Sequence, residues 1–126
     1  MTCSRNALPR YREIGVEHVY RLPFGCERTV YKKLNLRGTP IDVVFVGTCT
    51  LQRLKMIKAL LKANINVQLY GPYWKYFIKN NHVHDGVYGH EMVKIFNLSK
   101  IVLNFHADRR YGPNMRVFEA TGSGSF

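Results

Sequence analysis

The sequence of 126 residues has few cysteines and no long apolar run. Its three cysteines, Cys3, Cys26 and Cys49, are odd in number and lack any C-x-x-C spacing, so they indicate neither a disulfide framework nor a zinc site. No apolar segment approaches the ~20 residues of a membrane-spanning helix, and the N-terminal MTCSRNALPRYREIG lacks the apolar core of a signal peptide. These features predict a cytoplasmic protein without a membrane span. His82 and His84 have no third ligand nearby, and we predict no metal site.

Acidic residues are also scarce, with 8 Asp and Glu against 19 Lys and Arg, which gives a formal charge of +11. Such a charge predicts attraction to anions, whether nucleic acid, anionic lipid or a phosphorylated small molecule. The basic residues are spread along the chain, with short clusters only at Lys32-Lys33 and Arg109-Arg110. That distribution favours a solvated basic surface over a nucleic-acid stripe. The lack of a helix-turn-helix, zinc-finger or RNP-type motif also argues against nucleic-acid binding.

The apolar fraction of 46% is typical of a chain with one folded core. From Ile41 on, segments with strand patterns alternate with segments with helix patterns. Short apolar runs predict strands, and apolar residues at helical spacing predict helices. We expect strands at 43–46, 65–70 and 100–105, and helices at 51–62, 74–80, 91–98 and from 115 on, with a loop at 82–89. This order predicts an α/β fold: a Rossmann-like, mostly parallel sheet with flanking helices. Thr50 is the expected N-cap and Asn64 the expected C-cap of the helix at 51–62.

The first 40 residues do not have the pattern of an independent domain. Residues 16–22 alternate apolar and polar side chains, which predicts a half-buried strand that Pro23-Phe24-Gly25 ends. Residues 27–38 are polar and basic and predict a linker or a loosely packed connection. At the other end, the chain stops at Ser125-Phe126, where another strand would begin, which suggests truncation. An unpaired sheet edge there would favour association of two copies.

Two stretches carry polar groups suited to a ligand site. Gly47 and Thr48 follow the first strand, where the backbone N–H groups of residues 48–50 would point toward an anion, and Arg53 lies one turn further on. This is neither a Walker A nor a G-x-G-x-x-G motif, and the alternative for Arg53 is a solvated helix cation. The turn at Gly71-Pro72 is flanked by Tyr70, Tyr73 and Trp74, which suit either stacking on a base or the rim of the core.

The second stretch runs from Lys100 to the C-terminus as a strand, a loop, a helix and a glycine-rich turn. The loop 106–113 carries His106, Asp108, Arg109 and Arg110, and Asn114 can cap the helix that follows. Glu119 could accept hydrogen bonds from a ribose diol, or else pair with Arg116 as its i,i+3 neighbour. Gly122-Ser123-Gly124 ends the helix and would let backbone approach a ligand closely. No Ser/His/Asp or Cys/His spacing indicates covalent catalysis, so no catalytic residue is assigned.

Four segments together resemble a known family: FVGTCTLQR, VQLYGPYW, GVYGHEMVKIFNLSKIVLNFH and NMRVFEATGSGSF. They are similar to the CgeB-like, glycosyltransferase-like family of spore-maturation proteins, which resemble the C-terminal, nucleotide-sugar-binding half of GT-B glycosyltransferases. The upstream HVYRLPFGC looks like the end of the preceding domain. The resemblance therefore implies that residues 1–40 are the end of that domain plus a linker. Residues 41–126 would be a partial GT-B donor-binding domain, incomplete at its C-terminus.

The resemblance also implies roles for particular residues. Gly47, Thr48 and Arg53 would hold the diphosphate, Tyr70 and Gly71 would lie near the base-binding loop, and Glu119 would hold the donor ribose. Asn114 and Arg116 would shape the pocket beside it, and Gly122 and Gly124 belong to the same motif. No cofactor is expected, since the nucleotide-diphosphate sugar is the substrate.

Two departures from the family pattern matter. Many retaining GT-B enzymes have a further glutamate eight residues before the ribose-binding one, and Tyr111 stands there. The acceptor domain and the closing part of the donor domain are absent, so we expect this chain alone to lack the full catalytic machinery. Three functions remain open: a glycosyltransferase donor domain with an unknown acceptor, a non-catalytic α/β interaction or structural module, and a basic nucleic-acid-binding protein.

Overall fold

The protein is an α/β domain with a four-stranded, all-parallel sheet in the order β3-β2-β1-β4. The structure, a computed structural model, describes residues 5–79, 81–105 and 113–125. The strands are β1 (Ile41–Val46), β2 (Val67–Tyr70), β3 (Val83–His84) and β4 (Ser99–Leu103). The helices are α1 (Ala7–Glu13), α2 (Leu51–Lys62), α3 (Gly89–Leu98) and α4 (Met115–Gly122), with a 3₁₀ turn at Trp74–Tyr76. The predicted Rossmann-like sheet with flanking helices is confirmed.

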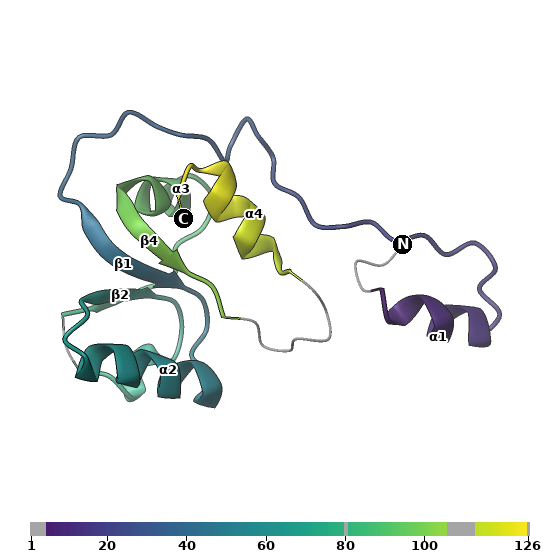
Figure 1. The fold of residues 1–126 in the computed structure, drawn as a ribbon, viewed down its shortest axis with the longest axis horizontal. Coiled ribbons are helices and arrows are strands. Elements are labelled where there is room, and N and C mark those ends of the chain that lie inside the picture. The colour runs from purple at the N-terminus through teal and green to yellow at the C-terminus, as the bar shows by residue number, and fades with distance from the viewer. Residues whose placement is uncertain (1–4, 80, 106–112, 126) are drawn as a thin grey trace.

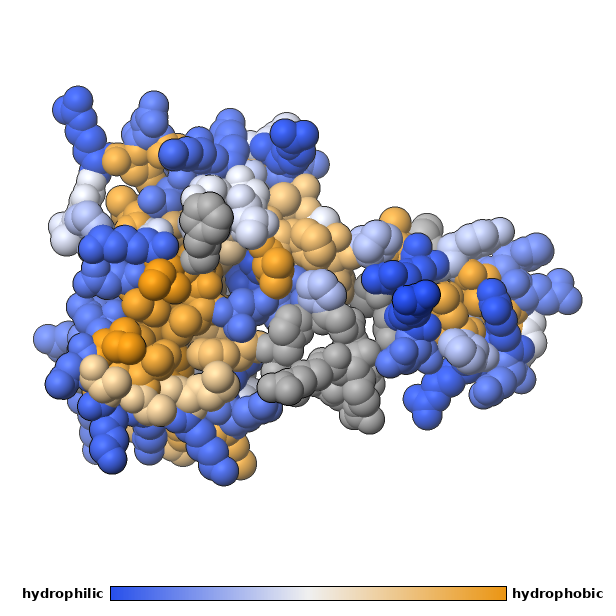
Figure 2. Space-filling view, in the orientation of Figure 1, coloured by the Kyte–Doolittle hydropathy of each residue, from blue (hydrophilic) through white to orange (hydrophobic). Residues whose placement is uncertain are grey.

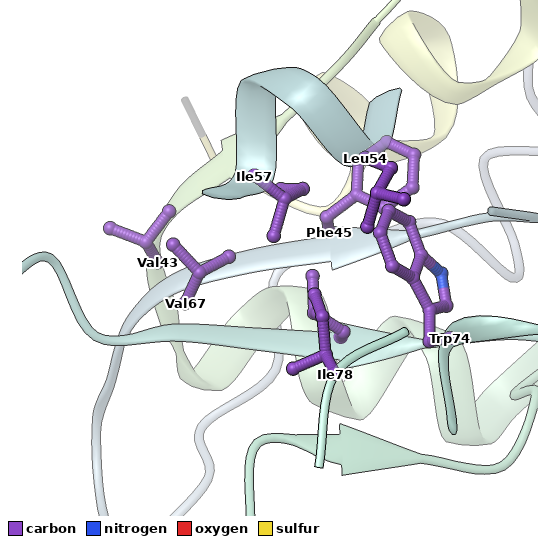
Figure 3. Packing of buried hydrophobic residues seen from close by; sticks show 8 residues of the cluster. Val43, Phe45, Leu54, Ile57, Val67, Trp74 and Ile78 are labelled. Carbon is purple, nitrogen blue, oxygen red and sulfur yellow. The ribbon is translucent and has the colours of Figure 1, made fainter. Parts of the chain in front are cut away.

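Helices cover the central strand β1 on both faces, which explains its continuous apolar run. On one face Val43 and Phe45 pack beneath Leu54 and Ile57 of α2, together with Trp74 (Figure 3). On the other face a second cluster joins β1 to α3 and α4, and its buried members are Val44, Val46, Met92, Phe96, Val102 and Ala120. Because successive side chains of a strand point to opposite faces, this one strand supplies both cores.

The best-defined helix, α2, has the bounds that its sequence predicts. The Thr50 hydroxyl accepts a hydrogen bond from the backbone N–H of Arg53 at 3.4 Å, as expected of an N-cap. At the other end the C-cap is Ala63, one residue before the expected Asn64. Asn64 instead takes the left-handed conformation at φ 58°, the role of the residue just past a helix end.

Three shorter elements differ from expectation. Residues 16–22 do not form a strand of the sheet. They belong to the N-terminal segment, which the four-stranded sheet does not include. The expected loop 82–89 contains β3, which pairs with β2 over only two residues, too few for an alternating pattern. Gln68 fixes this pairing: its amide oxygen accepts from Nε2 of His84 at 2.6 Å, and its Nε2 lies 2.9 Å from Nδ1 of His82. The expected helix 74–80 is a single 3₁₀ turn.

The N-terminal segment has two parts with different relations to the sheet. Helix α1 has no buried residue and lies apart from the sheet, joined to it by an extended segment (Figure 1). Residues 26–34, which we call the strap, are instead held against the helices. The side chain of Asn97 on α3 accepts from the backbone N–H of Leu34 at 2.7 Å and donates to the carbonyl of Lys32 at 3.0 Å. The expected loose connection is therefore fastened to α3.

Hydrophilic side chains dominate the face of the molecule shown in Figure 2, on the sheet domain and on the N-terminal segment alike. An apolar group interrupts them over the sheet. Among the helices of the described residues, none combines the length and apolar character needed to cross a membrane.

Candidate functional site

A cavity of about 410 Å³ opens where β1 ends and α4 begins. Its walls come from the Gly47-Thr48 turn, from Arg53 on α2 and from the first turns of α4. Six of the ten predicted donor-site residues line it: Gly47, Thr48, Arg53, Asn114, Arg116 and Glu119. Residues from five separate segments of the chain therefore meet at the carboxyl edge of a parallel sheet, where open α/β sheets bind ligands.

Arg53 is held in place by two backbone carbonyls, and no carboxylate among the described residues forms an ion pair with it. Nη1 donates to the carbonyl of Thr48 at 3.0 Å and Nη2 donates to the carbonyl of Phe105 at 3.1 Å, while the guanidinium lies 5.3 Å from the centre of the Phe45 ring. Nε is buried and has no hydrogen-bond partner among the described residues. Burial lowers the pKa of Arg53 below its ordinary value, and the positive charge of Arg116 lowers it further. An anion in the cavity would relieve both effects.

Glu119 is the carboxylate of the site, and only 5% of its surface is exposed. Oε2 accepts from Nη1 of Arg116 at 2.6 Å, and Oε1 accepts from the Tyr31 hydroxyl at 2.9 Å. Nη1 of Arg116 also contacts the sulfur of Met92 on α3. The expected pairing of Glu119 with Arg116 is confirmed, and Glu119 also lines the cavity.

The Gly47 turn is tied to the neighbouring strand end. The Gly47 N–H donates to the carbonyl of Tyr70 at 2.8 Å, and the Cys49 N–H donates to the carbonyl of Pro72 at 3.1 Å. The expectation that the N–H groups of residues 48–50 all face a ligand is therefore wrong for Cys49, because the carbonyl of Pro72, just beyond β2, already accepts from that N–H. The helix that begins at the cavity is α4, since Asn114, Met115 and Arg116 all line it.

Asn114 stands at the N-cap position of α4, but its side chain makes no capping hydrogen bond. Its Nδ2 donates to Oδ1 of Asn104 at 3.0 Å, which ties the end of β4 to the start of α4. Its Oδ1 is buried without a hydrogen-bond partner among the described residues. Because a buried unsatisfied oxygen costs about 1–3 kcal/mol, Asn114 offers an acceptor to a ligand that donates a hydrogen bond.

The other four predicted residues lie elsewhere. The ring of Tyr70 stacks on His84 with centres 4.6 Å apart, and burial raises the pKa of its phenol. Gly71 lines a separate hollow of about 540 Å³, with Tyr73, Tyr76 and Tyr88 around it. Gly122 and Gly124 face the strap instead of the cavity.

Some of the predicted polar groups lie outside the described residues. These are Tyr111, at the position of the missing second glutamate, and the loop residues His106, Asp108, Arg109 and Arg110.

Several residues at the site were not predicted, among them Asn104 and Met115, which line the cavity, and two aromatic residues of the N-terminal segment. Tyr31 binds Glu119 from 88 positions earlier in the chain, and Phe24 lines the cavity from the same N-terminal segment. Neither belongs to a polar motif, and the composition of residues 27–38 suggested a linker. Tyr31 is the one aromatic residue of that polar segment, and a single aromatic residue does not specify a partner.

Comparison with models of known protein families gives a match. A family described as glycosyl transferase-like matches residues 52–126, more than half of the chain. The matched region holds α2 except its first residue, the strands β2 to β4 and the helices α3 and α4, and with them Arg53, Arg116 and Glu119 of the cavity. No curated protein and no solved structure matches the chain.

Proposed function

This chain belongs to the glycosyl transferase-like family, and we propose that its cavity binds the nucleotide-diphosphate end of a sugar donor. The sugar would pass to an acceptor held outside this domain. The GT-B donor half, and the closer likeness to CgeB-like spore-maturation proteins, belong to this proposal and rest on the sequence motifs that end in NMRVFEATGSGSF.

The observation that carries the proposal is the unpaired charge of Arg53 in the cavity. Two carbonyls hold its guanidinium still, and among the described residues no carboxylate forms an ion pair with it. Arg116 brings a second guanidinium to the same cavity, close enough to lower the pKa of Arg53. A diphosphate placed between them would accept charge-assisted hydrogen bonds and face the positive end of α4.

Glu119 and the aromatic residues suit the rest of such a ligand. Each oxygen of an ionised carboxylate accepts two hydrogen bonds, so Glu119 keeps acceptor capacity beyond Tyr31 and Arg116. A ribose diol supplies two hydroxyl donors for that capacity. Phe24 and Phe45 give the cavity an apolar wall beside these polar groups.

In the transfer, the bond from the anomeric carbon to the diphosphate oxygen breaks, and its electron pair stays on the phosphate. The acceptor nucleophile forms the new bond to that carbon and loses its proton. Arg53, Arg116 and the N-terminus of α4 would stabilise the charge that develops on the leaving diphosphate. No residue is assigned as general base.

A non-catalytic structural module is the alternative, and one observation favours it. Glu119 is buried and already bonded through both oxygens, as in an ion pair that only holds α4 in place. This reading predicts that no nucleotide binds.

Isothermal titration of the 126-residue chain with UDP, GDP, ADP and TDP tests the proposal. We expect one diphosphate to bind, and Arg53→Ala to weaken it about tenfold to a hundredfold, the value of hydrogen bonds to a charged group. Glu119→Ala should weaken the same nucleotide. Lys58→Ala is the matched control, since it removes one positive charge from an exposed position of the same helix.

If no nucleotide binds to a chain that unfolds cooperatively, the donor-site proposal is wrong and the structural module is favoured. Equal losses in Arg53→Ala and Lys58→Ala would show that only the overall charge attracts the anion. The same titration at several salt concentrations separates these cases, because nonspecific attraction falls steeply with salt.

A further inference from the structure

Tyr31 contacts Glu119, a residue of the cavity wall, from outside the region that the family match covers. Its hydroxyl donates to Oε1 of Glu119 at 2.9 Å, across 88 positions of sequence. The strap that carries it is fixed at its other end by the two hydrogen bonds of Asn97 to the backbone of Lys32 and Leu34. The phenol is thus held at Glu119 by a segment that is itself anchored.

Helix α4 is shaped to receive the strap. A Cβ at Gly122 would lie 2.6 Å from Sγ of Cys26 and 3.3 Å from Cβ of Tyr31, so a side chain there would collide with the strap. Gly122 lies in the last turn of α4, three residues after Glu119. Close packing at Gly122 and the hydrogen bond at Glu119 therefore hold the strap on the same helix.

We propose that Tyr31 is a positioning residue of the donor site: its hydroxyl orients Glu119 so that the carboxylate can receive the ribose diol. This inference rests on the proposed function. Tyr31 takes one lone pair of Oε1 and Arg116 takes one of Oε2, which leaves one acceptor position on each oxygen for the ligand. The two protein donors fix the plane of the carboxylate before the ligand arrives.

Loss of the phenol would free Oε1 to turn. In this structure Arg116 donates to Glu119 only from Nη1 to Oε2. An arginine guanidinium can also donate to both oxygens of a carboxylate at once. Without Tyr31, the bidentate pair with Arg116 would compete with the diol for the same lone pairs. Tyr31 therefore keeps Glu119 available as well as oriented.

The Tyr31 hydroxyl keeps its proton at neutral pH. Burial, and then the hydrogen bond to Glu119, raise the pKa of Tyr31 above its ordinary value. The phenol therefore stays protonated, and the hydrogen bond persists, through the physiological range.

The test measures discrimination between ribose and deoxyribose. The full chain and Tyr31→Phe are titrated with UDP, GDP and ADP and with their 2′-deoxy counterparts. We expect the wild type to prefer the ribose form of the bound nucleotide by about tenfold, the value of one hydrogen bond to a charged acceptor. In Tyr31→Phe this preference should fall to about twofold, with the affinity for the deoxy form unchanged. Tyr20→Phe, at an exposed position of the N-terminal segment, should keep the full preference.

A second variant guards against a folding artefact. Asn97→Ala loosens the strap without touching Glu119, and it should reduce the ribose preference in the same direction. The inference is overturned if Tyr31→Phe keeps the wild-type preference, or if it weakens both forms equally, which is the sign of a purely structural role. If the wild type binds none of these nucleotides, the proposed function fails first and this inference fails with it.

Discussion

The indole N–H of Trp74 donates to the carbonyl of Gly47 at 2.8 Å and so joins the hydrophobic core to the edge of the cavity. The Trp74 side chain is fully buried, and its ring meets that of Phe45 edge to face, with centres 5.7 Å apart. Phe45 in turn lies beneath the guanidinium of Arg53. The position of the Arg53 guanidinium therefore depends on the packing of the core under α2.

Trp74→Phe tests this dependence. The variant loses the hydrogen bond to Gly47 and leaves space in the core, and we expect the free energy of unfolding to fall by about 1–3 kcal/mol. Urea denaturation measures the change. Tyr76→Phe is the control, because Tyr76 is 76% exposed in the same turn and should change stability by less than about 0.5 kcal/mol. Equal stability of the two variants would contradict the assigned role of Trp74.

Gly71→Ala should be among the most damaging single substitutions. At φ +143° a Cβ would lie 2.4 Å from the carbonyl oxygen of Gly47, and that neighbour is backbone and cannot rotate away. We expect a loss of about 3 kcal/mol or more, from strain plus overpacking.

Gly89→Ala separates these two causes. Gly89 also has a positive φ, +51°, but a Cβ there meets nothing within 4 Å. Its cost should be the strain alone, about 1–2 kcal/mol. Thermal unfolding of both variants under the same conditions gives the comparison, and a Gly89 cost as large as that of Gly71 would show that the close approach to Gly47 is unimportant.

The fold was predictable where the local pattern was long enough. The twelve residues of α2 and the N-cap Thr50 have a pattern that predicts where the helix begins and ends. The apolar run of β1 predicts a strand that is covered on both faces. The two-residue strand β3 could not be predicted, because its pairing depends on Gln68 and on the end of β2. Residues 16–22 have a strand pattern, yet the sheet of the described residues does not include them, and only Arg21 forms an isolated bridge.

Most of the polar residues of the candidate site could be predicted from the sequence, but the contacts that hold them in place could not. Arg53, Arg116 and Glu119 lie in recognisable segments, and the structure brings them to one cavity. Tyr31 could not be found, because a hydrogen bond across 88 positions leaves no local pattern. Gly122 was expected beside a ligand, and the structure places it against Cys26 instead.

The raised pKa of Tyr31 predicts a loss of stability at alkaline pH. A tyrosine whose pKa is higher in the folded state holds its proton more tightly when folded, so its contribution is complete below about pH 10 and falls as the pH rises through the folded value. Tyr31→Phe lacks this contribution at every pH. We expect the stability difference between wild type and variant to be constant from pH 7 to 9 and to shrink above pH 10.

Urea denaturation across that pH range measures the difference. Tyr70, whose pKa burial also raises, is present in both proteins and should leave a common alkaline loss. A difference that stays constant up to pH 11 would contradict the protonated hydrogen bond to Glu119.

Gly122→Ala should separate the strap from α4, and a second substitution should restore the contact. In a helix, alanine in place of glycine ordinarily stabilises by about 0.5–1 kcal/mol, but here the Cβ would lie 2.6 Å from the sulfur of Cys26. Overpacking costs about 1–3 kcal/mol, so we expect a net loss of stability and a weaker ribose preference. Cys26→Ala removes the sulfur, and the double variant should regain at least half of the lost stability, although the 3.3 Å contacts with Tyr31 remain. A double-mutant cycle in urea gives the coupling energy between the two positions. If Gly122→Ala instead stabilises the protein by the ordinary helical amount, the strap does not pack on α4, and the path by which Tyr31 reaches Glu119 is wrong.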